Sequence, residues 1–166
     1  MDEQVKSVEL TRISKLLEGS FKTQAWHGSS TMALLKDVTV EQALKHPIPN
    51  VHSIWEIVNH ILVWEIEAKK ILEGKTFLFL SQEEYWPAID DTSEEAWKET
   101  VENLEKANHE LSEAISKFDV SKLDDVMDIS DVWPSPWDET SYYILIHGTI
   151  DHDIYHAGQI AILKKG

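Results

Sequence analysis

Residues 151–160 read Asp151-His152-Asp153-Ile154-Tyr155-His156-Ala157-Gly158-Gln159-Ile160, within a segment from Ser141 to Lys165 that we expect to form one long helix. His152 and His156 are four residues apart, so on a helix they lie one above the other on the same face. Each imidazole can turn one ring nitrogen toward a common point, which makes the pair half of a metal site. A histidine pair at this spacing is also common without any function, so the pair alone does not decide between the two interpretations.

A third histidine, His60, lies in another strongly apolar segment, predicted to be a helix that begins after Ser53 and ends near Glu73 and Gly74. Serine is a favoured helix N-cap, and glycine often follows the last helical residue. A buried imidazole needs a hydrogen-bond partner, so two of them on one inward face need an explanation, while His60 alone is typical of a core or helix–helix hydrogen-bonding histidine. They are either exposed or bonded to backbone carbonyls, or they bind one ion together.

The second interpretation predicts a metal site on His60, His152 and His156, with Asp151, Asp153 or a neighbouring carboxylate orienting the ring N–H groups. Three protein ligands with an open fourth position are typical of a catalytic site. Nitrogen donors of this kind suit Zn²⁺, Ni²⁺, Co²⁺ or Fe²⁺, and ligand type does not choose between them.

The rest of the chain predicts two more long helices. The first runs from Val5 to about Thr23, where apolar residues recur at three- and four-residue steps. The second begins after Thr92 and ends at about Phe118, and its apolar residues recur at near-heptad spacing. Thr92 and Glu95 form a capping-box pattern ahead of the second of these. A shorter helix, 40–45, is expected after Thr39. With almost no strand signal, residues 1–166 are predicted to be one all-α domain, a four-helix bundle with long connections.

Composition excludes several classes of function. The 166 residues include no cysteine, which rules out disulfides, cysteine-type zinc sites and a cysteine nucleophile, and which favours a reducing compartment. A formal net charge of −15 without a basic run argues against nucleic acid as a partner. The polar N-terminal residues do not resemble a signal peptide, and the apolar stretches are interrupted by charges, so we expect a cytoplasmic protein with no membrane partner.

The combination of three stretches resembles the DinB-like superfamily. These stretches are Trp26-His27-Gly28, His52-Ser53-Ile54-Trp55-Glu56-Ile57-Val58-Asn59-His60, and His152-Asp153-Ile154-Tyr155-His156-Ala157-Gly158-Gln159-Ile160. The resemblance implies a bundle of up-up-down-down connectivity, often as a homodimer, with zinc or nickel on three histidines. On this chain those histidines correspond to His60, His152 and His156, the same three that the helical spacing and the apolar segments indicate.

Characterised relatives in this superfamily include transferases and an isomerase that use a low-molecular-weight thiol such as bacillithiol or mycothiol. The leading hypothesis is therefore a metal-dependent S-transferase acting on a small-molecule substrate. A substrate cavity beside the metal would be walled by aromatic or imidazole rings. The candidates are Trp26, His27, Trp64, Tyr155 and the loop from Trp133 to Trp137.

Two alternatives remain open from the sequence. The first is a metal-dependent hydrolase, which needs a general base; Glu56 is one helical turn from His60 and is the candidate. The second is a non-enzymatic, metal-binding stress-response module. The superfamily name refers to induction by DNA damage, but the acidity of this chain argues against DNA binding.

Overall fold

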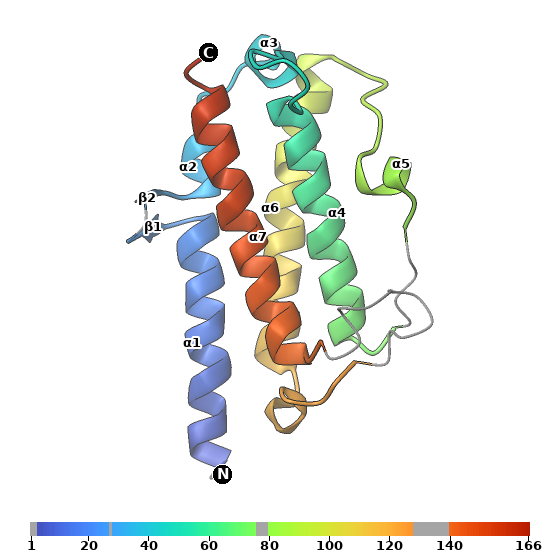
Figure 1. Cartoon of the computed structure of the whole chain (residues 1–166). Helices are drawn as coiled ribbons and strands as arrows, with labels where there is room; N and C mark the ends of the chain where they lie inside the picture. Colours follow the sequence, from blue (N-terminus) through green and yellow to red (C-terminus); the bar gives the residue numbers. More distant parts are fainter. Residues whose placement is uncertain (1–2, 27, 76–79, 128–139) are drawn as a thin grey trace.

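Four long helices dominate the computed structural model, which describes residues 3–26, 28–75, 80–127 and 140–166 (Figure 1). They lie side by side as a bundle, and the fold is all-α as predicted. Their bounds are α1 Glu3–Phe21, α4 Ile54–Leu72, α6 Glu94–Lys117 and α7 Tyr142–Leu163.

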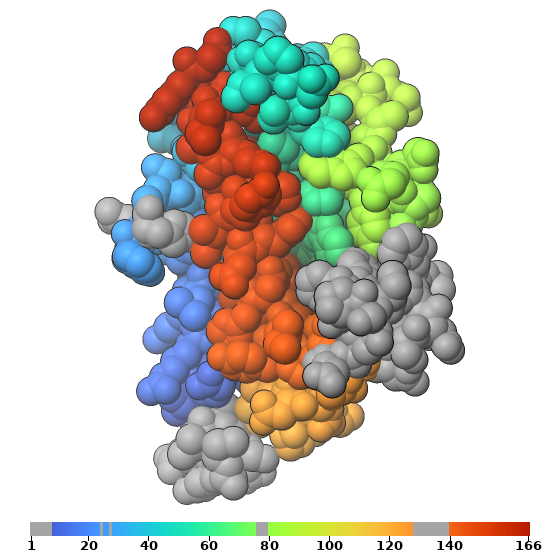
Figure 2. Space-filling view, viewed as in Figure 1, coloured from blue at the N-terminus to red at the C-terminus, as the bar shows by residue number. Residues whose placement is uncertain are grey.

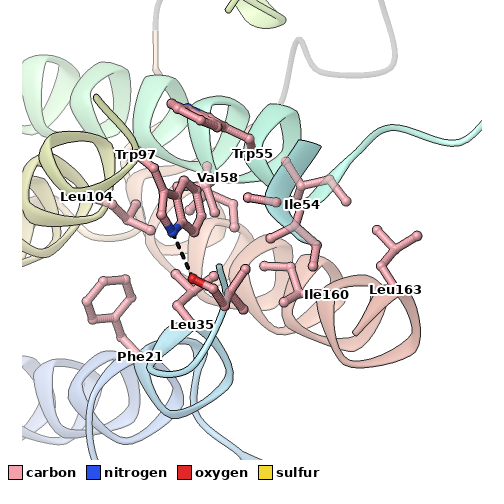
Figure 3. Close-up of a cluster of buried hydrophobic side chains, with 13 residues drawn as sticks. Phe21, Leu35, Ile54, Trp55, Val58, Trp97, Leu104, Ile160 and Leu163 are labelled. Carbon is pink, nitrogen blue, oxygen red and sulfur yellow. Dashed lines mark hydrogen bonds between the residues drawn. The ribbon is translucent and has the colours of Figure 1, made fainter. Parts of the chain in front are cut away.

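Two clusters of buried apolar side chains show how the helices run. One joins the end of α1 and the end of α7 to the starts of α4 and α6 (Figure 3). The other joins the first half of α1 and the first half of α7 to the later turns of α4 and α6. Helices α1 and α7 therefore run one way and α4 and α6 the other. In chain order the directions are up, down, down, up, so the up-up-down-down order expected from the resemblance is not confirmed.

The crossover that this order requires lies between α4 and α6, two parallel neighbours joined by the long connection 73–93. That connection contains the short helix α5 (Gln82–Tyr85), which the sequence did not predict. The connection from α1 to α4 instead contains a two-stranded antiparallel hairpin, β1 (Gln24–Ala25) and β2 (Gly28–Ser29), followed by α2 (Thr31–Leu35) and α3 (Val40–Leu44). A 3₁₀ turn, η1 (Val120–Lys122), follows α6.

Serine or threonine residues occupy the N-cap positions of helices α2 to α7, because the side-chain hydroxyl accepts a hydrogen bond from an otherwise unpaired backbone N–H of the first turn. Ser53 caps α4 in a capping box with Glu56, and Thr39 caps α3 in the same way with Gln42. The predicted capping box of Thr92 and Glu95 is wrong. Ser93 is the N-cap of α6 and accepts from the Ala96 N–H, so the helix begins one residue later than the pattern suggested.

Aromatic side chains fix the end of the bundle where α4 and α6 begin. Trp97 of α6 and Trp55 of α4 pack against each other with ring centroids 5.2 Å apart. The indole N–H of Trp97 donates to the Val38 carbonyl at 3.0 Å (Figure 3), which ties the segment between α2 and α3 to α6. Among the described residues, no helix combines the length and the apolar character needed to cross a membrane.

Candidate metal centre

Helices α4 and α7 bring the three predicted histidines together. His60 lies on α4, and His152 and His156 lie on successive turns of α7, which runs antiparallel to α4. The Nε2 atom of His152 lies 3.1 Å from Nε2 of His60 and 3.1 Å from Nε2 of His156. The three rings thus present the same nitrogen to one shared point, although His60 and His152 are separated by 92 residues in the chain.

Hydrogen bonds to carbonyl oxygens determine which ring nitrogen of His60 and of His156 carries the proton. The His60 Nδ1–H donates to the backbone carbonyl of Tyr85 at 2.8 Å, and the His156 Nδ1–H donates to the Gln159 side-chain oxygen at 2.7 Å. A carbonyl oxygen has no proton to give, so the proton must sit on Nδ1 in both rings. Each Nε2 then carries a lone pair directed at the shared point.

This arrangement fits a divalent metal ion. Two histidine nitrogens bound at about 2.0–2.1 Å to a tetrahedral ion lie roughly 3.3 Å apart, close to the 3.1 Å observed here. Lone pairs that face one another at this distance repel unless a cation or a proton lies between them. Within the described part of the chain, these three residues form the group of His, Asp or Glu side chains suited to holding a metal.

Burial keeps the three imidazoles neutral. Removal from water lowers the pKa of His60, of His152 and of His156 to about 4. Loss of solvent disfavours the charged imidazolium, and repulsion from neighbouring histidines adds to the lowering of the pKa of His60 and of His156. At neutral pH the nitrogens are therefore unprotonated, which is the form that binds metals.

Aromatic rings surround the cluster. Trp86, which follows α5, stacks on His60 at 3.9 Å with an interplanar angle of 4°, and also on His52 at 3.6 Å. Trp64 of α4 lies 5.7 Å from the His152 ring and stacks on Tyr85 at 5.0 Å. The segment carrying α5 thus contributes both an indole face and a backbone acceptor to the site.

Of the residues predicted to line a substrate cavity, two lie beside the histidines and one lies away from them. Trp64 adjoins His152, and Tyr155 meets His156 edge-on at 5.1 Å while remaining 64% exposed. Trp26 is 97% exposed in the turn of the hairpin, which projects beyond α1 on the side of the bundle away from α5 (Figure 1). The remaining candidates, His27 and the loop from Trp133 to Trp137, lie outside the described residues. The substrate-binding role of all these residues stays a prediction.

Glu56, the candidate general base, is engaged in hydrogen bonds at the start of α4. Its carboxylate accepts the Ser53 N–H at 2.7 Å in the capping box of α4 and lies within 4 Å of His46 and His52. Partial burial works against ionisation, but the bonds from Ser53 and the two nearby imidazoles lower the pKa of Glu56. A carboxylate held at the helix start in this way is directed toward the cap and is a weak base.

Two carboxyl groups are buried behind the histidines. Glu65 and Asp153 are both 0% exposed and interact with each other, while Asn108 donates its Nδ2–H to Glu65 Oε1 at 2.6 Å. Burial raises the pKa of Asp153 to about 8 and raises that of Glu65 well above its usual range, with repulsion from Asp153 adding to the shift. Two adjacent buried carboxyls cannot both ionise, so the pair holds a shared proton at pH 7. Asp151, the other predicted carboxylate, is exposed.

Three contributors to the site were not among the site residues predicted from the sequence. Gln159 had a detectable signal, because it lies three residues after His156 and so on the same face of α7. Trp86 and the Tyr85 carbonyl had none, because their approach to His60 depends on how α5 and the residues after it pack against α4.

The fold and the cluster define a class of protein, a helical bundle with a candidate three-histidine metal centre between two of its long helices. Residues 24–160 match the sequence pattern of the DinB superfamily, and the chain belongs to that superfamily. A crystal structure described as the conserved protein of locus from Enterococcus faecalis is similar, with a TM-score of 0.58 and 20% identity over 98% of this chain and 94% of that one. This likeness supports the fold alone. No curated protein matches the chain.

Proposed function

We propose that this DinB-superfamily protein is a metal-dependent enzyme that holds one divalent ion on His60, His152 and His156. The observation that carries the proposal is the convergence of the three Nε2 atoms, with the proton of two rings fixed on the opposite nitrogen. A purely structural zinc site closes its fourth position with a protein ligand. Among the described residues no fourth His, Asp or Glu joins the group, which favours a catalytic role.

The substrate class that we favour is a low-molecular-weight thiol together with an electrophilic acceptor. A bound divalent ion lowers the pKa of a thiol or a water that reaches it. The chain's own part is to keep three imidazoles neutral by burial and to exclude water with Trp86 and Trp64.

Thiol transfer is favoured over hydrolysis because of Glu56. A hydrolase needs a base to take a proton from the attacking water, and the carboxylate one turn from His60 is held in the helix cap. A thiol needs no such base once its pKa is lowered below the ambient pH. Metal-assisted hydrolysis is therefore the second candidate, and a metal-binding module without turnover is the third.

The test begins with metal content. Protein purified without chelator is analysed for Zn and Ni beside His60→Ala, His152→Ala and the control His109→Ala, whose side chain is 75% exposed. We expect about one equivalent of metal in the wild type and the control, with loss in the two site variants. A wild type that neither carries nor takes up Zn²⁺ or Ni²⁺ contradicts the proposal.

The loaded protein is then assayed with bacillithiol, mycothiol or glutathione and a fluorogenic electrophile. Transfer that is lost on chelation and in His152→Ala supports the thiol reaction. Release of nitrophenol from an ester without any thiol supports hydrolysis instead. A loaded protein that is inactive in both assays supports the non-enzymatic module.

A further inference from the structure

One of the three histidines lacks the hydrogen bond that orients the other two. The Nδ1–H groups of His60 and His156 each have a carbonyl acceptor within 2.8 Å. The Nδ1 atom of His152 is buried, and within the described residues it has no hydrogen-bond partner. Oδ1 of Asp153 lies 3.8 Å away, in a carboxyl group whose two oxygens are also without a hydrogen-bond partner.

The acceptor for His152 is held in place from two other helices. Asn108 of α6 donates to one oxygen of Glu65, and the other oxygen, Oε2, is buried and interacts with the Asp153 carboxyl group. The groups form a continuous buried row, Asn108–Glu65–Asp153–His152, from α6 through α4 to α7. Glu65 and Asp153 have no exposed surface, so bulk solvent does not reach either carboxyl group.

We propose that Asp153, supported by Glu65 and Asn108, is the positioning residue for the metal ligand His152. Its carboxyl group, 3.8 Å from the Nδ1 atom of His152, is the acceptor for that N–H when the ring binds an ion. A histidine that binds a metal through one nitrogen usually donates its other N–H to a carboxylate or carbonyl, which fixes the ring and makes the ligand more basic. The inference rests on the proposed metal site, and it explains why an acid pair lies buried directly behind that site.

A row of this kind could instead serve packing alone, by joining three helices through hydrogen bonds. The two roles differ in what they change. A packing role affects the stability of the metal-free bundle and leaves the affinity of the folded protein for metal unaltered. A positioning role affects metal affinity and the geometry of the bound ion, even in variants whose metal-free stability is unchanged.

The experiment compares three variants. Asp153→Leu removes the acceptor at similar volume, and Asp153→Asn keeps an acceptor oxygen for His152 while its amide donates to Glu65. Glu65→Gln keeps the Asp153 carboxylate and supplies a donor to it. Affinity for Zn²⁺ is measured by competition with a chromophoric chelator, and Co²⁺-loaded protein gives the visible spectrum of the site. Urea unfolding of metal-free samples reports stability.

We expect Asp153→Leu to weaken Zn²⁺ binding by about 10- to 100-fold and to change the Co²⁺ spectrum. Glu65→Gln should bind at least as tightly as the wild type, and Asp153→Asn should fall between them. Equal affinities and identical spectra in all variants would overturn the positioning role. Should Asp153→Leu fail to fold, the order of Glu65→Gln over Asp153→Asn decides. A wild type that binds no metal refutes the metal site itself, which is a different result.

Discussion

At the scale of single residues, Glu65 and Asp153 give the protein a specific pH dependence. The unfolded chain releases carboxyl protons near pH 4, whereas the raised pKa of Asp153, about 8, lets the folded pair retain a proton to much higher pH. Between these values the folded state holds more protons than the unfolded state, so this pair makes stability fall as pH rises from about 4 to 8.

Glu65→Gln should reduce this fall in stability with pH, since the Asp153 carboxyl group then receives a hydrogen bond from an amide and no longer faces a second acid. We expect the free energy of unfolding of metal-free Glu65→Gln, relative to metal-free wild type, to rise by on the order of 1 kcal/mol or more between pH 5 and pH 8. Urea unfolding at both pH values measures it. The three histidines are present in both proteins, so their own titration cancels in the difference. A difference that does not change with pH contradicts the shared proton.

At the scale of elements, substitutions at the start of α6 can test whether Ser93 is the N-cap of that helix. Ser93 accepts the Ala96 N–H, while Thr92 lies outside the helix. Loss of a capping hydroxyl costs about 1 kcal/mol. Ser93→Ala should therefore lower the free energy of unfolding by about that amount, and Thr92→Ala, the matched control, should change it by less than about 0.5 kcal/mol. Denaturant unfolding of both variants checks this, and the reverse order would restore Thr92 as the cap.

The elements also show how far the sequence could predict the structure. The four long helices were predictable, because apolar spacing and caps such as Ser53 act within one helix. The pairing of His152 with His156 was predictable for the same reason. The hairpin and α5 were not, because strands of two residues and a helix of four leave no periodic pattern. The Tyr85 carbonyl at His60 was not predictable either, since any residue supplies a carbonyl and only folding determines which one arrives.

At the scale of the whole molecule, the outer face of α7 is the surface on which we expect the homodimer implied by the family resemblance. This face is exposed and poor in charge, and α7 lies along the front of the molecule in Figure 2. Ile144, Tyr155 and Ile162 are 48%, 64% and 61% exposed. The exposed positions at helical spacing are Ile144, Gly148, Asp151, Tyr155, Gly158 and Ile162.

These six positions are symmetric about residue 153. If two copies of α7 cross in antiparallel fashion there, isoleucine meets isoleucine, glycine meets glycine, and the hydroxyl of Tyr155 meets the carboxylate of Asp151 in the other copy. Glycine permits close approach of helices, and an added Cβ at Gly148 or Gly158 would meet nothing within 4 Å in the single chain. The stripe is thus complementary to a second copy of itself.

Replacing Ile144 and Ile162 together by lysine should convert a dimer to a monomer, because it puts four charges into an apolar contact. The control is Val126→Lys, which changes a β-branched apolar residue that is 56% exposed and lies outside this stripe. Light scattering after size-exclusion chromatography measures the mass. A wild type that is monomeric, or a double variant that stays dimeric, rules out this face.

The separation of His60 from His152 by 92 residues also has a consequence for biosynthesis. At translation rates of about 5 to 20 residues per second, His60 is made roughly 5 to 20 s before its partners on α7. During that interval α4 offers a lone imidazole, too weak a ligand to retain an ion. In the proposed metal site the three ligands come together only after α7 has docked against α4, so the appearance of bound Co²⁺ colour during refolding would report the time at which α7 docks.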